Sequence, residues 1–172
     1  MIFLGIGANL PSERHGPPLL TLEAALKSLA ERNLAILRRS SWWESAPVPV
    51  SEQPWFVNGV IEVGTNMTPQ ALLDCLHDVE RELGRVRGER WAARVIDLDL
   101  IAYRGSVLGW RGESSRATGL VVPHPRMHQR AFVLRPLVEL QADWRHPVFG
   151  RTADELLDAL PPGQAIRQRI DS

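Results

Sequence analysis

The sequence predicts an α+β domain with a ferredoxin-like βαββαβ core, in which an antiparallel sheet lies in a three-layer α/β/α arrangement with appended C-terminal helices. Two observations support this fold class. Segments with strand-like and helix-like periodicity follow one another in the order strand, helix, strand, strand, helix, strand, and further helical segments come only after them. The chain of 172 residues also has the length of one domain, so we expect a single domain over residues 1–172.

The first strand and the first helix are separated by a long loop. Residues 2–7 are an apolar run typical of a buried strand, and residues 8–18 are polar and rich in proline. A helix then opens at Thr21, and its apolar positions recur with helical spacing at Leu22, Ala25, Leu26 and Leu29. One face of this helix should therefore pack on the sheet.

The second and third strands are joined by a proline-rich connection. Residues 35–44 predict one strand, and the alternation over residues 56–63 predicts the next. Residues 46–54 between them contain three prolines and cannot form regular structure. Thr68, followed by a proline, is an N-cap that begins a second helix, which runs to about Leu83 and stops at the glycine after it.

The remaining elements follow an arginine-rich loop over residues 84–95. The apolar run around Asp97 predicts the fourth strand of the core. Residues 105–118 are polar and glycine-rich, which is typical of a hairpin or an excursion, and residues 121–125 form a loop constrained by two prolines. Two helices, over residues 132–140 and 152–160, complete the chain.

Composition and charge argue against several classes of protein. Twenty basic and twenty acidic residues give a net charge of zero, which disfavours a protein that coats nucleic acid. No segment approaches the roughly 20 consecutive apolar residues of a membrane span. The apolar run at the amino terminus has no basic region before it, so it is predicted as a strand and not as a signal peptide. A single cysteine, Cys75, indicates a reducing compartment, and we expect a cytoplasmic protein.

Asp97 and Asp99 are two acidic residues within an otherwise apolar run. In a strand, residues i and i+2 point to the same face, so the two carboxylates should be neighbours. Adjacent carboxylates repel each other, and a bound cation would remove the repulsion. Oxygen ligands suit Mg²⁺, which typically takes one or two carboxylates and completes its shell with water and phosphate oxygens. The alternative is a pair of solvated aspartates at the end of a strand.

Arginines are concentrated just before this aspartate pair. The loop contains Arg85, Arg87, Arg90 and Arg94 around Trp91, a mixture suited to binding phosphates and to stacking. A solvated basic loop is the alternative interpretation of this segment taken alone. Together with a metal-binding aspartate pair, the arginines favour transfer of a phosphoryl-type group, which needs positioning and neutralisation of charge on phosphate oxygens. The chain contains no P-loop motif, so it is not a P-loop enzyme.

Two further groups of side chains suit a flat heterocyclic ligand. Phe56 and Asn58 share one face of a predicted strand, where the ring can stack and the carboxamide can hydrogen-bond the edge of the ligand. The alternative is a core aromatic beside a polar turn residue. His124, Arg130 and Phe132 add an imidazole, a cation and a second ring, although an isolated histidine more often packs in the core or lies at the surface.

Other polar residues carry weaker signals. Glu80 lies on the second predicted helix and is expected to be an ordinary surface acid. Asn9 follows the first strand, where it can cap a turn or adopt a left-handed conformation. The histidines lack the spacing of a zinc site, and the sequence contains no recognisable Ser/His/Asp or Cys/His group.

Taken in order, these motifs resemble those of the 6-hydroxymethyl-7,8-dihydropterin pyrophosphokinases of folate biosynthesis. The resemblance runs from the first strand to about Leu140. The motifs that carry it are Gly7-Ala8-Asn9-Leu10, Gln53-Pro54-Trp55-Phe56-Val57-Asn58, the segment from Glu80 to Arg85, Arg90-Trp91, Arg94-Val95-Ile96-Asp97-Leu98-Asp99-Leu100, Val122-Pro123-His124-Pro125-Arg126-Met127 and Arg130-Ala131-Phe132.

The resemblance implies a Mg²⁺-dependent transfer of the diphosphate group of ATP to the hydroxymethyl group of 6-hydroxymethyl-7,8-dihydropterin, which gives AMP and the pterin diphosphate in tetrahydrofolate biosynthesis. It implies that Asp97 and Asp99 hold two Mg²⁺ ions and form the catalytic set together with Arg85 and Arg94. It places contacts to ATP at His77, Arg87, Arg90, Trp91, Leu100, His124 and Arg130, of which Arg87, Arg90 and Trp91 lie in a loop that closes over the site. It places contacts to the pterin at Ser45, Ala46, Val48, Phe56, Asn58 and Phe132, with the two phenylalanines on either side of the pterin ring.

Two other functions would use similar parts. A ferredoxin-like sheet with exposed aromatics and arginines can stack RNA bases, but the zero net charge and the aspartate pair disfavour an RNA-binding module. A Mg²⁺-dependent nucleotidyltransferase or diphosphatase is a closer alternative, because the same metal-binding and phosphate-binding residues serve either reaction. We expect the small-molecule substrates ATP and 6-hydroxymethyl-7,8-dihydropterin, no nucleic-acid or membrane partner, and a monomer.

Overall fold

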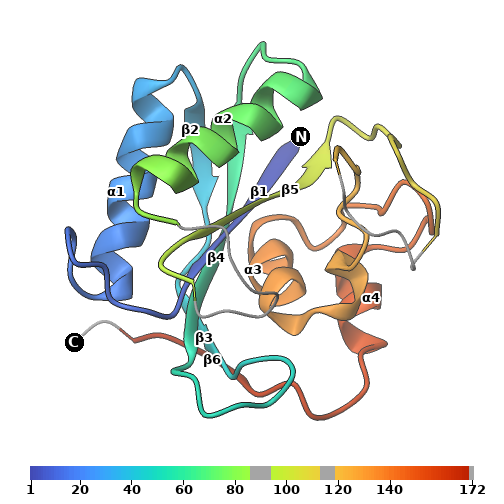
Figure 1. Cartoon of the computed structure of the whole chain (residues 1–172). Helices are drawn as coiled ribbons and strands as arrows, with labels where there is room; N and C mark the ends of the chain where they lie inside the picture. The colour runs from blue at the N-terminus through green and yellow to red at the C-terminus, as the bar shows by residue number, and fades with distance from the viewer. Residues whose placement is uncertain (86–93, 113–118, 171–172) are drawn as a thin grey trace.

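The computed structural model describes residues 1–85, 94–112 and 119–170 (Figure 1). Strands and helices alternate in the predicted order over the core, and short helices follow it. In chain order the elements are β1 (Ile2–Ala8), α1 (Pro18–Glu31), β2 (Ala35–Arg39), β3 (Trp43–Ser45), β4 (Phe56–Gly64), α2 (Pro69–Glu82), β5 (Asp97–Tyr103), a 3-10 turn η1 (Met127–Gln129), α3 (Ala131–Gln141), α4 (Ala153–Asp158) and β6 (Ile166–Gln168).

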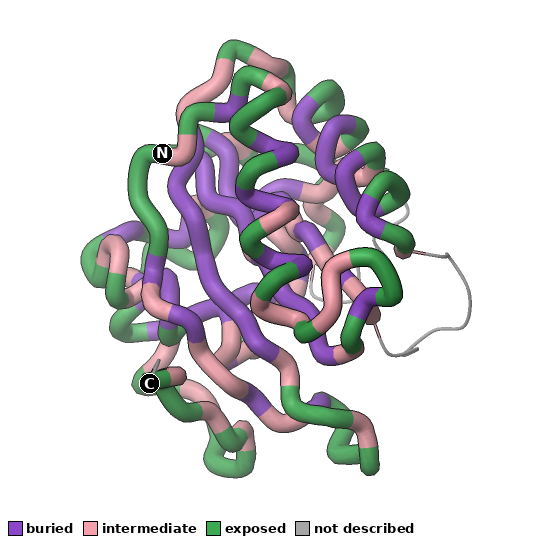
Figure 2. Tube along the Cα trace, turned by 90° about the vertical axis from the view of Figure 1, so that its left-hand side faces the viewer, coloured by how far each residue is buried: buried purple, intermediate pink, exposed green. Residues whose placement is uncertain are grey.

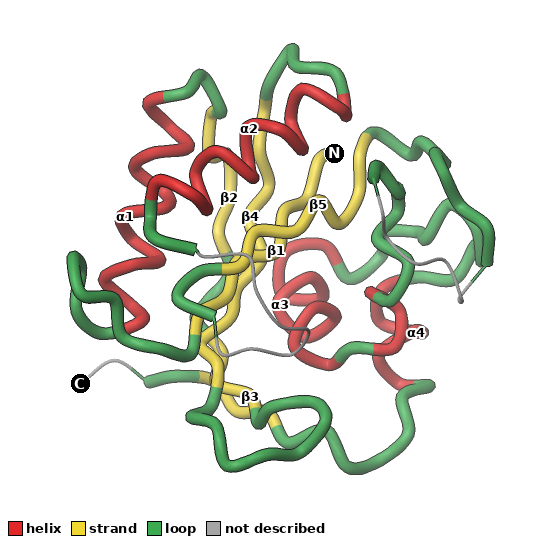
Figure 3. The backbone as a smooth tube through the Cα atoms, in the orientation of Figure 1, coloured by secondary structure: helices red, strands yellow, loops and turns green. Residues whose placement is uncertain are grey.

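The strands form one antiparallel sheet, shown in yellow in Figure 3. Its order is β5-β1-β4-β3-β6, and β2 also pairs with β4. Strand β1 is central, with Gly7 opposite both Asn58 of β4 and Asp97 of β5, and Gly5 opposite both Val60 and Asp99. The predicted α+β class with its antiparallel sheet is therefore confirmed.

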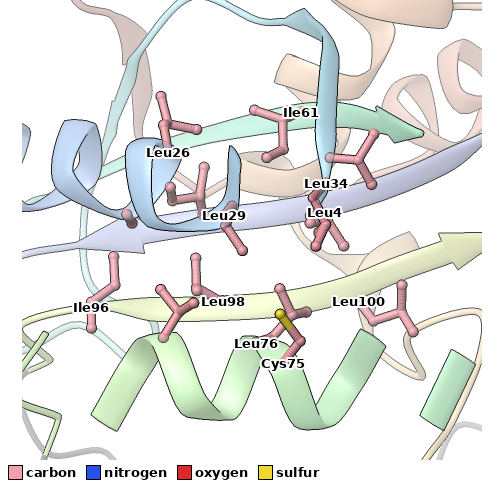
Figure 4. Close-up of a cluster of buried hydrophobic side chains, with 14 of the residues drawn as sticks. Leu4, Leu26, Leu29, Leu34, Ile61, Cys75, Leu76, Ile96, Leu98 and Leu100 are labelled. Carbon is pink, nitrogen blue, oxygen red and sulfur yellow. The ribbon is translucent and has the colours of Figure 1, made fainter. Parts of the chain in front are cut away.

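Helices α1 and α2 cover one face of the sheet and contact each other there (Figure 1). Figure 4 shows labelled side chains of the core between these helices and the sheet. The alternation of β1 sends Leu4 and Ile6 to this face, and they join the core with Leu29 of α1 and Leu76 of α2. Cys75 packs in the same core as a small, buried side chain with a free thiol. Burial is concentrated on the strands and on the inner faces of these helices (Figure 2).

Helix α3 packs on the opposite face, against β3 and β4, and α4 packs on α3. Phe3 of β1 and Ile101 of β5 point to this side and join Leu134 and Leu137 of α3 in a second core. The two cores give the three-layer arrangement that the sequence predicts. Among the helices of the described residues, none has the length and apolarity to cross a membrane.

The prediction of one continuous strand over residues 35–44 is wrong, because the structure has two strands there with a break between them. Strand β2 ends at Arg39 and β3 begins at Trp43. Between them the buried side chain of Trp42 turns into the first core. Its ring packs so closely on Gly59 that a Cβ atom added to this glycine would lie only 3.0 Å from the ring. The hydroxyl of Ser40 accepts a hydrogen bond from the backbone N–H of Val60 at 3.0 Å, so the break leaves this amide satisfied.

Two helix boundaries and one strand also differ from the prediction. Helix α1 begins at Pro18, one turn before Thr21, because proline is well suited to the first helical position. The last helix is shorter than predicted and spans Ala153–Asp158, with Thr152 and Glu155 forming a capping box. Strand β6 was not predicted. Its side chains are mostly exposed, so its sequence has no apolar alternation.

Candidate active site

A cavity of about 420 Å³ opens on the α3 side of the sheet. Its floor comes from the central strands, and its walls come from the connection between β3 and β4 and from the segment that leads into α3. Residues that line it include Gly5, Gly7, Ser45, Ala46, Pro47, Val48, Gln53, Phe56, Asn58, Arg94, Asp97, Asp99, Arg126, Gln129, Arg130 and Phe132.

Two glycines of β1 keep the floor of this cavity free of side chains. A Cβ atom on Gly7 would lie 2.7 Å from Oδ1 of Asn58, and one on Gly5 would lie 3.2 Å from Cδ1 of Ile101. A side chain at either position would therefore crowd a neighbour as well as fill the cavity. Because the glycines lie between β4 and β5, they separate an acidic side from an aromatic and amide side.

The acidic side carries Asp97 and Asp99. Both line the cavity, whereas Leu98 between them is buried in the core under α1 and α2. The prediction that the two carboxylates share one face of a strand is therefore confirmed. Burial and the charge of Asp99 raise the pKa of Asp97, while Arg94 and Arg85 lower it.

Two arginines hold the carboxylate of Asp97. Arg94 donates from Nη1 to Oδ2 at 2.6 Å, and Arg85 donates from Nη1 to Oδ1 at 2.9 Å. Each oxygen of Asp97 therefore has its own guanidinium donor, which compensates for the neighbouring charge of Asp99.

Arg85 is in turn anchored by Glu80, which is only 2% exposed. The Oε1 atom of Glu80 accepts hydrogen bonds from Arg85 and, at 2.8 Å, from the backbone N–H of Leu98. Burial raises the pKa of Glu80 to about 7, although these two donors act in the opposite direction. The prediction of a surface acid is wrong, and helical spacing could have corrected it, because Glu80 follows the buried Leu72 and Leu76 on one face of α2.

The opposite wall carries an amide held in place by a hydroxyl. Asn58 donates from Nδ2 to Oγ of Ser45 at 2.7 Å, and both residues are buried. This bond directs the carboxamide of Asn58 toward the cavity floor beside Gly7. Phe56 precedes it on the same face of β4, as predicted, and also lines the cavity.

The segment before α3 contributes an imidazole, a cation and a ring. Nδ1 of His124 accepts from the backbone N–H of Arg126 at 3.1 Å, so the neutral imidazole carries its proton on Nε2. Burial and the charge of Arg130 lower the pKa of His124 to about 3, which keeps it neutral. The guanidinium of Arg130 lies 5.5 Å from the centre of the Phe132 ring.

Asn9 is a positioning residue whose importance was missed in the interpretation as a turn residue. It is buried, it donates to the backbone oxygen of Pro54 at 3.2 Å, and its Oδ1 accepts from the backbone N–H of Arg94 at 3.0 Å. It thereby joins the loop before β4 to the residue that binds Asp97. Its place directly after β1, within the Gly7-Ala8-Asn9-Leu10 motif, was the available signal.

The structure brings together most of the residues that the sequence singled out. Those that line the cavity are Ser45, Ala46, Val48, Phe56, Asn58, Arg94, Asp97, Asp99, Arg130 and Phe132. Arg85 contacts Asp97 without being part of the lining. His77 of α2 and His124 also lie outside the lining, and Leu100 is buried in the core on the other face. The predicted nucleotide contacts Arg87, Arg90 and Trp91 lie outside the described residues.

Solved structures share this fold. A structure described as HPPK-DHPS in complex with substrates matches 92% of this chain with a TM-score of 0.66 and 11% identity. A mutant HPPK-DHPS of Plasmodium falciparum matches 91% of it with a TM-score of 0.70 and 16% identity. The chain spans 42% and 43% of the length of these two proteins, and at such identity the likeness establishes the fold alone.

Sequence comparison gives a closer relationship. Three bacterial proteins named 2-amino-4-hydroxy-6-hydroxymethyldihydropteridine pyrophosphokinase are similar to this chain. The protein of Pseudomonas aeruginosa is 39% identical, with 93% of this chain and 91% of the relative covered. That of Methylorubrum extorquens is 35% identical, with 93% of each chain covered. That of Synechocystis is 36% identical, with 90% and 73% covered. Residues 3–142 match the model of the 7,8-dihydro-6-hydroxymethylpterin-pyrophosphokinase family, and the chain belongs to this family.

Proposed function

We propose that the cavity is where the diphosphate group of ATP passes to the hydroxymethyl group of 6-hydroxymethyl-7,8-dihydropterin, which yields AMP and the pterin diphosphate for tetrahydrofolate synthesis. One observation carries this proposal. A single cavity has carboxylates and arginines on one side and a buried amide with aromatic rings on the other, and two glycines form the floor between them. One side suits charged phosphates, and the other suits a flat heterocycle.

The pterin half follows from Asn58, Phe56 and Phe132. Asn58 uses one amide hydrogen on Ser45, so its oxygen and its second hydrogen remain to bind a ring edge that offers both a donor and an acceptor. Phe56 and Phe132 come from different elements and both line the cavity, which allows them to contact opposite faces of the pterin. The backbone of Ser45, Ala46 and Val48 supplies the remaining polar groups.

The metal-binding half rests on Asp97 and Asp99, whose carboxylates fit Mg²⁺. The two side chains are adjacent on one face of β5 and provide only oxygen ligands. They also border the cavity, where water and phosphate oxygens can complete the coordination shell. We propose that they hold two ions. When bound, Mg²⁺ would neutralise charge on the ATP phosphates and orient them.

Basic residues around the aspartates bind the nucleotide in this proposal. Arg94 and Arg130 line the cavity and can contact phosphate oxygens, and Arg85 is held beside Asp97 by Glu80. His124 presents a protonated Nε2 and therefore acts as a neutral hydrogen-bond donor. His77, Arg87, Arg90, Trp91 and Leu100 are proposed as further nucleotide contacts on the strength of the family resemblance.

The rate acceleration in this proposal comes from alignment and charge neutralisation. Among the described residues that line the cavity, Asp97 and Asp99 are the only acidic side chains. Asp97 is occupied by two arginines, and His124 carries its proton on the nitrogen that remains after the contact with Arg126. With Asp97 and Asp99 assigned to the metal ions, this proposal leaves no lining carboxylate as a dedicated general base, and positioning of the two substrates carries the reaction.

We further propose that residues 1–172 act as a single-domain, cytoplasmic monomer. The cavity draws its lining from β1, β4, β5 and α3 of one chain, so it needs no second copy to be complete. Helix α4 packs on α3 and β6 pairs with β3, which ties the carboxyl-terminal part to the core. The buried free thiol of Cys75 suits a reducing compartment.

Calorimetric titration tests the assignment of the two halves. A non-hydrolysable ATP analogue should bind in the presence of Mg²⁺ and weakly without it, and the pterin should bind once the nucleotide is present. Phe56→Ala should lose pterin affinity and keep nucleotide affinity. Phe149→Ala is the matched control, because Phe149 packs in an aromatic cluster around His146 and lies outside the cavity.

The alternatives give different results in this experiment. Nucleotide binding without pterin binding would favour a nucleotidyltransferase or diphosphatase. Tight binding of RNA that weakens steeply with salt would favour an RNA-binding module.

A further inference from the structure

The carboxyl-terminal segment, residues 163–168, packs behind the residues that form the pterin half of the cavity, and it lies outside the part of the chain that matches the family model, residues 3–142. Strand β6 pairs with β3 so that Ile166 lies opposite Ser45. Just before it, the carbonyl of Ala165 accepts a hydrogen bond from the backbone N–H of Ala46 at 3.0 Å. The loop assigned to the pterin is therefore held along its outer side by this segment.

The side chain of Gln164 reaches the opposite wall of the cavity. Its Oε1 accepts from the backbone N–H of Ala131 at 2.8 Å, and its Nε2 donates to the backbone oxygen of Gln129 at 2.9 Å. The N–H of Ala131 can only donate and the carbonyl oxygen of Gln129 can only accept, so these two partners determine which end of the Gln164 amide is oxygen and which is nitrogen. The two bonds bracket Arg130 and end directly before Phe132.

Gln164 also supplies a cap that helix α3 does not provide for itself. Arg130 occupies the N-cap position and makes no side-chain capping hydrogen bond. The first amides of a helix have no partner within the helix, so an acceptor from elsewhere is needed to fix them. Gln164 provides this acceptor at Ala131 and so fixes the start of the helix from which Phe132 projects.

A second, smaller cavity of about 180 Å³ lies between these elements. It is bordered by residues 45–50, by Ala131 and Phe132, and by residues 163–166. The loop and the ring of Phe132 thus have space behind them, and packing alone does not fix their separation. The carboxyl-terminal segment is hydrogen-bonded to both sides of this second cavity, through Ala165 to Ala46 and through Gln164 to Ala131 and Gln129.

We propose that Gln164 is a positioning residue for the pterin: through Ala131 and Gln129 it holds Phe132 and Arg130 at a fixed spacing from the loop over residues 45–48. This inference rests on the proposed function, because it takes that cavity wall as the pterin site. Gln164 does not contact the pterin itself and acts through the segment that it holds.

The test compares Gln164→Ala with Gln168→Ala. Gln168 lies in the same carboxyl-terminal segment, at the end of β6, and its side-chain amide donates to Ser41 at 2.9 Å, away from the cavity, which makes it a matched control. Loss of two hydrogen bonds should raise the KM and the Kd for the pterin about tenfold in Gln164→Ala. The kcat at saturating substrates and the Kd for the ATP analogue with Mg²⁺ should change by less than about twofold. Gln168→Ala should match the wild type in all four quantities.

Gln164→Glu refines the test, because it keeps the acceptor for Ala131 and loses the donor to Gln129. It should recover part of the lost pterin affinity. A wild-type pterin Kd in Gln164→Ala would overturn the proposal. Equal losses of kcat and pterin affinity in Gln164→Ala and in the control Gln168→Ala would also overturn it, because they would indicate general destabilisation. If the wild-type protein itself failed to bind pterin, the proposed function would fail and not only the role of Gln164.

Discussion

The carboxylate of Asp97 is shared between two guanidinium groups, one from each side of the arginine-rich loop. Arg85 comes from the end of α2 and Arg94 from the start of the segment before β5, and both reach the same carboxylate. The arginines that would bind phosphates are therefore already gathered at the aspartate pair proposed to bind metal. Their fixed positions limit the rearrangement that nucleotide binding requires.

Removal of Arg94 should impair catalysis more than it impairs folding. We expect Arg94→Ala to lower kcat/KM about 150-fold, about 3 kcal/mol of transition-state stabilisation, as for the loss of an oxyanion-type donor. Steady-state kinetics with both substrates measures this change. Arg39→Ala is the control, because Arg39 pairs with Glu23 outside the cavity. An unchanged kcat/KM in Arg94→Ala would remove Arg94 from the catalytic set.

At the scale of single residues, sequence reasoning succeeded where one local rule decided the outcome. The spacing of Asp97 and Asp99 placed both on one face of a strand, because strand side chains alternate whatever the surroundings. Glu80 and Asn9 were misjudged because their roles depend on partners distant in the sequence. Leu98 lies 18 residues from Glu80, and Arg94 lies 85 residues from Asn9.

Among the elements, α2 and β5 are joined at one point by the buried carboxylate of Glu80. It connects the last turn of α2 to the backbone of β5 at Leu98 and to Arg85. The raised pKa of about 7 means that the folded protein holds a proton on Glu80 more tightly than the unfolded chain does, where the value is 4.5. The stability from this group is therefore complete below pH 4.5 and is lost as the pH rises to 7.

Glu80→Gln removes this titration and keeps an acceptor for Leu98. As the pH rises from 4.5 to 8, the free energy of unfolding of the wild type should fall by about 3 kcal/mol relative to the variant. Urea unfolding across this range measures the difference. Glu82→Gln is the control on the same helix, and its profile should stay nearly parallel to that of the wild type over this range, because Arg32 lowers the pKa of Glu82 and its titration falls mainly below pH 4.5. Parallel profiles for wild type and Glu80→Gln would contradict the assignment.

The limits of prediction at the scale of elements have a physical origin. Strands buried on both faces or with clear alternation were found, as were helices with an apolar stripe. The break between β2 and β3 was not predicted, because a tryptophan at position 42 is as compatible with a continuous strand as with a turn into the core. Strand β6 was not predicted, because it is held by backbone pairing to β3 and buries little apolar surface.

Across the whole molecule, the two faces of the sheet serve different purposes. The face under α1 and α2 is packed throughout with apolar side chains, and the face under α3 leaves the glycines of β1 open. The sequence indicated a three-layer fold and most of the residues that line the cavity. The contacts of the carboxyl-terminal segment with the residues behind one wall were not predicted, because Gln164 resembles any polar residue in a loop.

An aromatic cluster beyond α3 provides a test of how the carboxyl-terminal part contributes to overall stability. His146 is fully buried, with the rings of Trp110, Trp144, His128 and Phe149 around it. Its Nδ1 accepts from the backbone N–H of Val148 at 3.2 Å. Burial and the nearby His128 lower the pKa of His146 to about 4.

A lowered pKa in a base means that the folded state favours the neutral form. The stability from His146 is therefore complete above its unfolded pKa of 6.5 and is lost as the pH falls to 4. His146→Asn keeps an acceptor for the backbone of Val148 and removes the titration. Between pH 7 and pH 4 the wild type should lose about 3 kcal/mol more than the variant in urea unfolding. A constant difference over this range would show that burial of the imidazole does not control acid stability.

Product analysis with Asp97 variants distinguishes diphosphate transfer at this cavity from other reactions of ATP. Incubated with ATP, Mg²⁺ and 6-hydroxymethyl-7,8-dihydropterin, the wild-type protein should form AMP and the pterin diphosphate in equal amounts, without ADP. Asp97→Ala and the near-isosteric Asp97→Asn should form no detectable AMP while keeping a folded-state melting transition. Asp78→Ala, which removes an exposed partner of Arg81 on α2, should react like the wild type. Near-normal AMP formation by the Asp97 variants, or ADP in place of AMP from the wild type, would contradict a metal-assisted diphosphate transfer at this cavity.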